Sequence, residues 1–257
     1  MDGLDARLRA LERLLESERA ARAQAERGNR LTEHFLATLS HELRNPLNAI
    51  LGWATVLTRR SDLPEPVTQG LQAIERNSRL QARMISDLLD YAAISLGKVR
   101  LVTETIDPYP LVRAVLEGVA AGARDAEVVV EASFEEASLR VEADSARLEQ
   151  IIWNLLTNAI KFSNRGDAVR LTAGRSGDSF RVVVSDRGKG IEPEFLPGIF
   201  DRFSQQDSTT TRSRGGLGLG MAIVKQLTDL HDGTIQAESA GKGLGATFTL
   251  ELPLSPQ

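Results

Sequence analysis

The first leucines of the chain lie on one seam of a predicted helix. They are spaced by four, three and four residues: Leu4, Leu8, Leu11 and Leu15. The seam ends where Glu18 and Arg22 occupy the next expected positions. This spacing predicts a short coiled-coil lead-in over residues 1–30. A solvated helix with a single apolar stripe is the alternative, because so few heptads do not define a coiled coil.

A longer amphipathic pattern follows over residues 31–60. Its apolar positions alternate steps of three and four, as in a helix with one buried face: Leu36, Leu39, Leu43, Leu47, Ile50, Ala54 and Leu57. The opposite, polar face carries Thr38, His41, Asn45, Asn48 and Gly52. Pro46 lies inside this helix and removes one backbone hydrogen bond, so we expect a kink about one turn beyond His41.

A third helix is predicted after a turn at residues 61–66. Its apolar face consists of Val67, Leu71, Ile74, Ile85, Leu88 and Ala92. Two amphipathic helices joined by a short turn form an antiparallel hairpin. A single hairpin leaves much of its apolar stripe in water, and a second copy buries that stripe in a four-helix bundle. The pattern therefore predicts a homodimer.

The pattern changes after Gly97, where short β-rich runs alternate with helical runs. The predicted strands are residues 128–131, 139–142, 169–173, 180–185, 234–238 and 246–252. The predicted helices are residues 111–121, 145–162 and 219–230. Mixed elements of this kind indicate a two-layer α/β sandwich, so the chain as a whole is of the α+β class. The stretch at residues 204–220 is rich in Gly, Ser and Thr, and its length is typical of a functional lid.

Composition and charge narrow the classes of function. The 257 residues are 42% hydrophobic and 26% charged, as in a globular protein. The net charge of −4 provides no global positive field, so we expect no nucleic-acid partner. The chain has no cysteine, which excludes disulfides, thiolate–metal sites and cysteine nucleophiles. No apolar run reaches bilayer length and no signal-peptide pattern opens the chain, so we expect a cytoplasmic protein without a membrane segment.

His41 and Glu42 form the first candidate site. A neutral imidazole nitrogen on the wet face of a helix can attack phosphorus near neutral pH. Glu42 could accept the proton from the other ring nitrogen as the attacking nitrogen gains its bond. By itself, a His-Glu pair on an exposed helix is more often plain solvated surface.

The second candidate site consists of Asn154, Asn158 and Lys161. Their spacing places all three on one helical face, and apolar residues cover the rest of that helix. Carboxamide oxygens are hard ligands suited to Mg²⁺, and a lysine one turn away can meet phosphate oxygens. The alternative is a polar stripe whose amides cap a neighbouring strand.

Two glycine-rich loops complete the candidate sites. Asp186 follows a predicted strand, and Gly188 and Gly190 after it let the backbone turn tightly beside a flat ligand, although an ordinary turn has the same pattern. Residues 215–220 place four glycines ahead of a helix, where backbone N–H groups and the helix dipole favour an anion. A flexible hinge loop is the alternative there.

Taken in order, these motifs resemble those of the sensor histidine kinases. The stretch His41-Glu42-Leu-Arg-Asn45-Pro46 is similar to the phosphoacceptor box, and residues 148–162 resemble the N box. The stretch Asp186-Arg-Gly188-Lys-Gly190 is similar to the first glycine box, Ile199-Phe200-Asp-Arg-Phe203 to the F box, and residues 215–220 to the second glycine box. Residues 243–248 and 252–253 match the end of the family's ATP-binding domain. The resemblance covers residues 30 to 253.

The resemblance implies three regions and two kinds of partner. Residues 1–30 would be a coiled-coil signalling helix, residues 31–96 a dimerisation and histidine phosphotransfer hairpin, and residues 97–257 an ATP-binding catalytic domain. The substrate would be ATP with Mg²⁺, and the phosphoryl group would pass from His41 to an aspartate on the receiver domain of a response regulator. Phosphatase activity toward that regulator is a further possible function.

The resemblance also implies a role for each matched residue. His41 would be the nucleophile, Glu42 its general base, and Asn45 the group that orients the attacking group or a water. Asn154 and Asn158 would hold Mg²⁺ and Lys161 would contact phosphate. Asp186 would read the adenine amine, with Gly188 and Gly190 admitting the ring. The lid would be formed by Gly216, Leu217, Gly218, Leu219 and Gly220, and anchored by Phe200 and Phe203.

Two positions depart from the commonest family pattern. Leu217 stands where many members have threonine, which puts a side-chain hydroxyl contact in doubt, and Asn45 stands where threonine is frequent.

Two other classes of function are the alternatives. A hydrolytic ATPase of the same superfamily would carry a glutamate four residues before the metal-binding asparagine, where this chain has Asn154. A non-catalytic scaffold or phosphatase-only module is disfavoured by the joint presence of the site residues.

Overall fold

A computed structural model of the chain describes residues 43, 46–58, 60, 63–95, 99–135, 139–202, 204 and 218–255. The chain divides into two compact units, Met1–Leu96 and Gly97–Gln257. The predicted coiled-coil lead-in over residues 1–30 lies outside the described residues. None of the described helices is both long enough and apolar enough to cross a lipid bilayer.

The described part of the first unit is helical. Residues 46–58 form one helix, and α2 (Glu65–Ser95) forms the second after a short connection. The Thr55 hydroxyl donates to the Glu75 carboxylate at 3.0 Å, which joins the two helices, and Arg79 pairs with the same carboxylate at 2.5 Å. This arrangement confirms the two predicted helices and their pairing as a hairpin.

The apolar stripes of these helices are only partly covered within one chain. Leu47 and Ala54 are buried, as predicted, but Leu43 and Ile50 of the same stripe are 40% and 49% exposed. On α2, Val67, Ile74 and Leu88 are also exposed. A single hairpin therefore leaves apolar surface in water, as the amphipathic pattern predicted.

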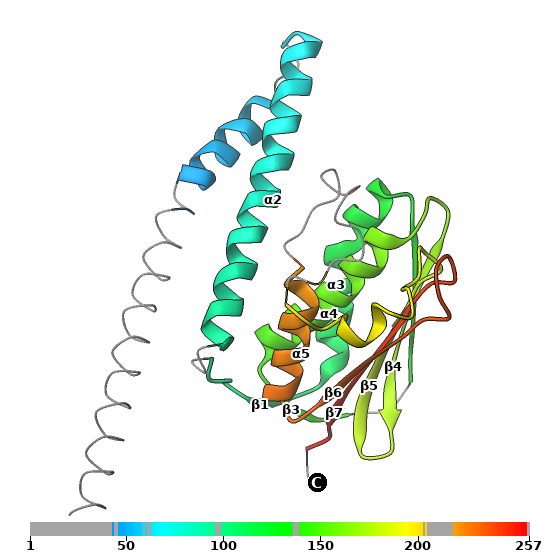
Figure 1. Cartoon of the computed structure of the whole chain (residues 1–257). Coiled ribbons are helices and arrows are strands. Elements are labelled where there is room, and N and C mark those ends of the chain that lie inside the picture. Colours follow the sequence, from blue (N-terminus) through cyan, green and yellow to red (C-terminus); the bar gives the residue numbers. More distant parts are fainter. Residues whose placement is uncertain are drawn as a thin grey trace, which may run out of the picture. The chain divides into compact units, whose positions relative to one another are not determined.

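The second unit is a two-layer α/β sandwich, which confirms the predicted fold class. Its five-stranded sheet has the order β2-β4-β5-β7-β6, and β2 is parallel to β4 while the other neighbours are antiparallel. The bounds are β2 Val129–Phe134, β4 Ala168–Ser176, β5 Ser179–Ser185, β6 Thr234–Glu238 and β7 Thr247–Pro253. Three helices lie along one face of this sheet: α3 (Pro108–Asp125), α4 (Ser145–Phe162) and α5 (Gly220–Leu230) (Figure 1).

Local chemistry defines where these helices begin. Asp107 caps α3 by accepting from the Tyr109 N–H, and proline follows at the first helical position. Asp144 caps α4 by accepting from the Arg147 N–H. By contrast, the N-cap of α5 is Leu219, which provides no side-chain hydrogen bond. The first turn of α5 therefore keeps backbone N–H groups that a ligand can satisfy.

The core of the second unit lies between the sheet and the helices. Strands β4 and β5 alternate buried and more exposed residues, as expected for strands packed on one face. The largest fully buried side chains are Leu148, Ile151, Ile152, Leu155, Leu156, Leu171, Phe180, Leu219, Ile223, Leu227, Leu250 and Leu252. Five of these belong to α4, so the helix that carries the predicted asparagines is anchored along its apolar side.

The sequence pattern missed two short elements. A strand β1 (Glu104–Ile106) pairs antiparallel with β3 (Val141–Ala143), apart from the main sheet. A 3₁₀ turn, η1 (Leu196–Gly198), follows the first glycine loop. Both span three residues, too short to show a period of two or of 3.6.

Candidate functional site

The polar face of α4 is the first component of the site. Asn154, Asn158 and Lys161 are half-buried, while the neighbouring Leu155, Leu156 and Ala159 are buried in the core. The Nδ2 atom of Asn154 is buried and has no hydrogen-bond partner among the described residues. An unsatisfied buried amide has a free-energy penalty that a ligand would remove.

Asp186 occupies the end of β5, and only 9% of it is exposed. Its carboxylate accepts from the Gly188 N–H at 2.9 Å, and its own N–H donates to the Ala246 carbonyl at 2.9 Å. Burial raises the pKa of this carboxyl group, because the charged form loses hydration. The Gly188 and Ala246 N–H groups act in the opposite direction, and Asp167 adds to the rise in pKa.

The loop after Asp186 rests directly on the C-terminal end of α4. The Lys189 N–H donates to the Phe162 carbonyl at 3.0 Å. A Cβ atom at Gly188 would lie only 2.1 Å from the same carbonyl oxygen, so no other residue fits there without a backbone shift. This contact holds Asp186 in a defined relation to the polar face of α4.

A second loop, residues 239–246 between β6 and β7, interlocks with the first. The Gly243 N–H donates to the Lys189 carbonyl at 2.6 Å, and the Gly245 N–H donates to the Gly188 carbonyl at 3.3 Å. Gly190 has φ of 66°, and a Cβ atom there would lie 2.0 Å from the Gly241 carbonyl oxygen. Gly188 therefore allows the close approach of the first loop to α4, and Gly190 allows the close approach of the two loops.

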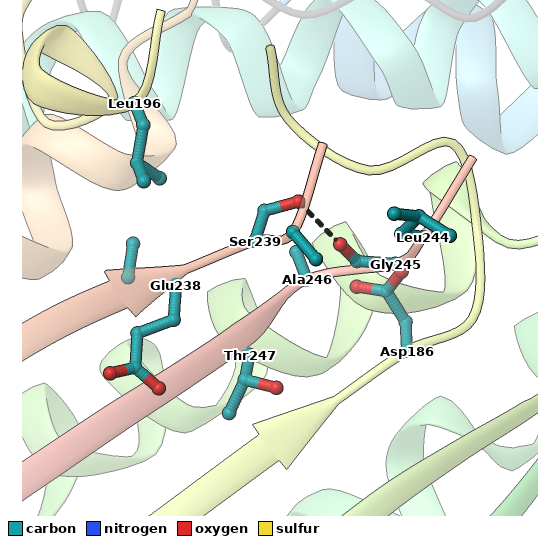
Figure 2. Close-up of a pocket in the computed structure, with 10 residues that line it drawn as sticks. Asp186, Leu196, Glu238, Ser239, Leu244, Gly245, Ala246 and Thr247 are labelled. Atoms are coloured by element: carbon teal, nitrogen blue, oxygen red, sulfur yellow. Dashed lines mark hydrogen bonds between the residues drawn. The ribbon is translucent and has the colours of Figure 1, made fainter. Parts of the chain in front are cut away.

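A cavity of about 460 Å³ opens where the ends of β5, β6 and β7 meet (Figure 2). It is lined by Asp186, Leu196, Ala237, Glu238, Ser239, Ala240, Leu244, Gly245, Ala246 and Thr247. Of these, sequence reasoning named only Asp186 as a site residue. The sequence signal for the other lining residues is the glycine pair at 243 and 245, which by resemblance marks only the end of the ATP-binding domain.

The segment that leads to the predicted lid is partly described. Phe200 packs edge-on against Phe248 of β7, with 6.5 Å between ring centroids, and the Ser204 hydroxyl donates to the Gly198 carbonyl at 2.7 Å. Gly218 has φ of 69°, Leu219 is buried and Gly220 begins α5. Phe203, Gly216 and Leu217 lie outside the described residues.

The predicted phosphoacceptor residues are also outside the described part of the chain. The structure does not describe His41, Glu42 or Asn45, and the helix at residues 46–58 is the next described element along the chain. Their roles therefore rest on the motif alone. Within the described part of the chain, no group of three or more His, Cys, Asp or Glu side chains could hold a metal ion.

The described groups suit a ligand that combines an aromatic base with an anion. A buried carboxylate can accept from an exocyclic amine, and the cavity of about 460 Å³ beside Asp186 has room for a flat ring. The uncapped start of α5 and the Lys161 ammonium both favour negative charge. The two asparagine amides provide neutral oxygen ligands for a hard cation that an anionic ligand brings with it.

Two protein-family models match the chain. Residues 31–97 match the His Kinase A (phospho-acceptor) domain, and residues 143–256 match the family of histidine kinase-, DNA gyrase B- and HSP90-like ATPases. The two matches follow one another along the chain in the order that the motifs predicted.

Individual proteins show the same likeness. The hybrid signal transduction histidine kinase D of Dictyostelium discoideum is 34% identical over 88% of this chain and 18% of its own length. The autoinducer 2 sensor kinase/phosphatase LuxQ of Vibrio parahaemolyticus is 35% identical over 94% of this chain and 29% of its own length. The chain thus spans less than a third of either relative.

Among solved structures, the full-length protein ShkA in complex with AMPPNP is similar in fold. It superposes with a TM-score of 0.70 at 30% sequence identity, over 86% of this chain and 46% of ShkA.

Proposed function

The chain belongs to the sensor histidine kinases, and from that premise we propose that it transfers the γ-phosphoryl group of ATP to its own His41. From His41 the group would pass to an aspartate on the receiver domain of a response regulator. The observation that carries the proposal is the buried Asp186 carboxylate at the head of a cavity formed by two interlocked glycine loops.

ATP would be recognised at two ends. Asp186 would accept from the adenine amine, since its carboxylate is held by the Gly188 N–H but keeps acceptor capacity. The triphosphate would lie toward Lys161 and the start of α5, where Leu219 leaves backbone N–H groups without a side-chain cap. Gly216, Leu217 and Gly218 would close over it as the lid, anchored by Phe200 and Phe203.

Asn154 and Asn158 would hold Mg²⁺ beside the phosphates. The residues present fit such an ion, because the buried Nδ2 atom of Asn154 has no hydrogen-bond partner among the described residues and the amide can turn to present its oxygen. The ion would neutralise charge on the phosphate oxygens when bound. Since no acidic cluster is described near it, the ion would arrive with the nucleotide rather than occupy a site of its own.

The transfer step needs in-line positioning more than covalent assistance. A ring nitrogen of His41 would form a bond to the γ-phosphorus as the bond from that phosphorus to the bridging oxygen breaks, and ADP would leave. Glu42 would accept the proton of the other ring nitrogen. The bond from the ring nitrogen to that phosphorus would then break as a carboxylate oxygen of the regulator bonds to it, and Glu42 would return its proton to the ring, which restores neutral His41.

The first unit would supply the dimer in which this occurs. Val67 and Ile74 are exposed and lie seven residues apart on α2, with Leu88 fourteen residues further on along the same face. A second copy of the hairpin would bury this stripe in a four-helix bundle. The homodimer and the regulator partner both remain part of the proposal.

A phosphatase activity toward the regulator is a second candidate function. A 35% identical relative is named a sensor kinase/phosphatase. Asn45 offers an amide one turn beyond His41 that could orient a water toward a phosphoaspartate.

The test is incubation with γ-labelled ATP and Mg²⁺, with His41→Gln and Asn158→Ala beside the wild type. We expect a label on the wild type that is lost in acid and stable in base, and no label on either variant. Direct ATP binding should survive in His41→Gln. A label that persists in His41→Gln would refute the assignment of the nucleophile. ATP binding without any label in the wild type would favour a scaffold or phosphatase-only module.

A further inference from the structure

Ser239, which follows β6, places one hydroxyl among four backbone groups of the two interlocked loops, of which the Gly241 carbonyl oxygen is the most distant at 3.4 Å. Its Oγ lies 2.6 Å from the Gly245 carbonyl oxygen, 2.9 Å from the Ile191 nitrogen and 3.3 Å from the Gly241 nitrogen. A hydroxyl has one hydrogen to donate and two lone pairs to accept. The hydroxyl therefore donates its hydrogen bond to the Gly245 carbonyl at the shortest distance. Its oxygen accepts hydrogen bonds from the Ile191 and Gly241 N–H groups.

The donated bond acts on the peptide that faces Asp186. Figure 2 shows the Ser239 hydroxyl directed at the Gly245 carbonyl, with Asp186 beside Gly245. The next residue, Ala246, accepts from the Asp186 N–H at 2.9 Å. A Cβ atom at Gly245 would lie 2.0 Å from the Asp186 carbonyl oxygen, so the two backbones are in close contact.

The Gly245–Ala246 peptide is planar, so the direction of its carbonyl also sets the direction of its N–H. The carbonyl belongs to Gly245 and is held by Ser239, while the N–H belongs to Ala246 and acts to lower the pKa of the Asp186 carboxyl group. A hydrogen bond to the carbonyl also polarises the peptide and strengthens its N–H as a donor. Ser239 thus acts on Asp186 through one rigid peptide.

The accepted bond from Ile191 holds the other side of the pocket. Ile191 follows Gly190 on the loop that begins with Asp186, and it lies 48 residues before Ser239 in the sequence. One hydroxyl therefore fastens the loop that carries Asp186 and the loop that supports it. An ion pair at 3.5 Å between Lys242 and Glu192 also joins these two segments.

We propose that Ser239 is a positioning residue for adenine recognition, holding the Gly245–Ala246 peptide so that it keeps the Asp186 carboxylate aimed at the base. The inference rests on the proposed ATP-binding function. It has a consequence for selectivity, because adenine presents an amine donor where guanine presents a carbonyl acceptor. Loss of the Ser239 hydroxyl should weaken ATP binding more than GTP binding.

A purely structural role predicts a different result. If the hydroxyl only stabilised the turn, its removal would lower the free energy of unfolding. The affinities for ATP and GTP would then fall by the same factor. The ratio of ATP affinity to GTP affinity therefore separates a positioning role from a merely stabilising one.

The experiment uses the full chain and measures Kd for ATP and for GTP by calorimetry, with the unfolding temperature as a check on folding. The variants are Ser239→Ala, which removes the hydroxyl, and Ser239→Thr, which keeps it. Ser145→Ala is the control, because its hydroxyl likewise donates one bond, 2.8 Å to a Glu104 carboxylate oxygen, and lies at the start of α4. Ser239→Cys, with similar volume and a weaker donor, replaces Ser239→Ala if the latter does not fold.

We expect Ser239→Ala to lose about three- to tenfold in ATP affinity, the effect of one hydrogen bond, with GTP affinity nearly unchanged. Ser239→Thr should restore the ATP-to-GTP ratio, and Ser145→Ala should leave it as in the wild type. An unchanged ratio in Ser239→Ala, or a loss in Ser239→Thr as large as in Ser239→Ala, would overturn the inference. A wild type that binds no ATP would instead refute the proposed function, so the two failures are distinguishable.

Discussion

The backbone N–H of Asp144 donates to Nε2 of His231 at 3.1 Å, which joins the start of α4 to the end of α5. Since an N–H can only donate, Nε2 is the acceptor and the ring hydrogen is on Nδ1, which lies 2.7 Å from the Leu227 carbonyl oxygen. The two residues are 87 positions apart in the sequence. This pair links the helix that carries Asn154 and Asn158 to the helix that follows the lid.

Replacing His231 should destabilise the second unit. The ring is buried and both of its nitrogens are bonded, so His231→Ala leaves a cavity and an unpaired Asp144 N–H, while the Leu227 carbonyl keeps its bond from the backbone N–H of residue 231. We expect a loss of about 2–4 kcal/mol in the free energy of unfolding, measured by urea denaturation. Asp232→Ala, on the exposed next position, is the control. A smaller loss of unfolding free energy in His231→Ala than in the control would show that the ring does not stabilise the contact between α4 and α5.

The Asp186→Asn substitution should separate binding from stability. The amide keeps an acceptor for the Gly188 N–H but removes the charge that would strengthen the bond to an amine. We expect ATP affinity to fall about ten- to hundredfold. Because burial disfavours the charged form and raises the pKa of Asp186, the neutral amide should leave the unfolding temperature at neutral pH unchanged or higher. A lower unfolding temperature would contradict this reading.

ATP affinity should also depend on pH through Asp186. Its raised pKa means that the carboxyl binds a proton at a higher pH than an ordinary aspartic acid, and a protonated carboxyl is a poorer acceptor. Affinity should therefore decline as the pH falls through that raised pKa. The folded state also holds more protons than the unfolded state in this window, so this group's contribution to stability decreases as the pH rises through it.

The control for the pH dependence is Asp186→Asn, which retains every other titrating group, including those of the nucleotide. Subtracting its profile from that of the wild type isolates Asp186. Parallel profiles for the two proteins would show that Asp186 does not govern the dependence.

The contact between Gly188 and α4 predicts a sharp difference between two glycine substitutions. In Gly188→Ala the new Cβ would lie 2.1 Å from the Phe162 carbonyl oxygen, so the loop and Asp186 must shift. We expect this variant to show no measurable ATP binding. We also expect its free energy of unfolding to fall by about 2 kcal/mol or more. In Gly122→Ala, on α3, the Cβ would meet no atom within 4 Å, and a gain of about 0.5–1 kcal/mol is expected. Circular dichroism melts and calorimetry check both.

The exposed stripe of α2 predicts the oligomeric state. Ile74 is 47% exposed within one chain, and a lysine there would place a charge in the proposed bundle interior. We expect Ile74→Lys to shift the protein from dimer to monomer in light scattering coupled to size exclusion. Gln72→Lys introduces the same charge on another face of α2 and should remain dimeric. A monomeric wild type would refute the proposed dimer.

Much of the fold follows from patterns that are local in sequence. The period of apolar residues defined α4 at residues 145–162, and alternation located β4 and β5 to within a few residues, because burial of one face acts on each element separately. The order of the motifs likewise indicated the family and placed Asp186 in the site. These features need only neighbouring residues, so a single sequence reveals them.

What the sequence did not show depends on backbone contacts between distant segments. The bonds of Ser239 to Ile191, of His231 to Asp144, and of Lys189 to the Phe162 carbonyl all involve main-chain atoms, whose positions no side-chain pattern encodes. Nor does the sequence show that Gly188 lies against the end of α4 and Gly190 against the second loop, and the role of both glycines in admitting a base stays a prediction. The sequence by itself determined the longer helices and strands, their order and the family. Only the tertiary structure decided how two glycine loops interlock around Asp186, because that depends on the approach of backbones far apart along the chain.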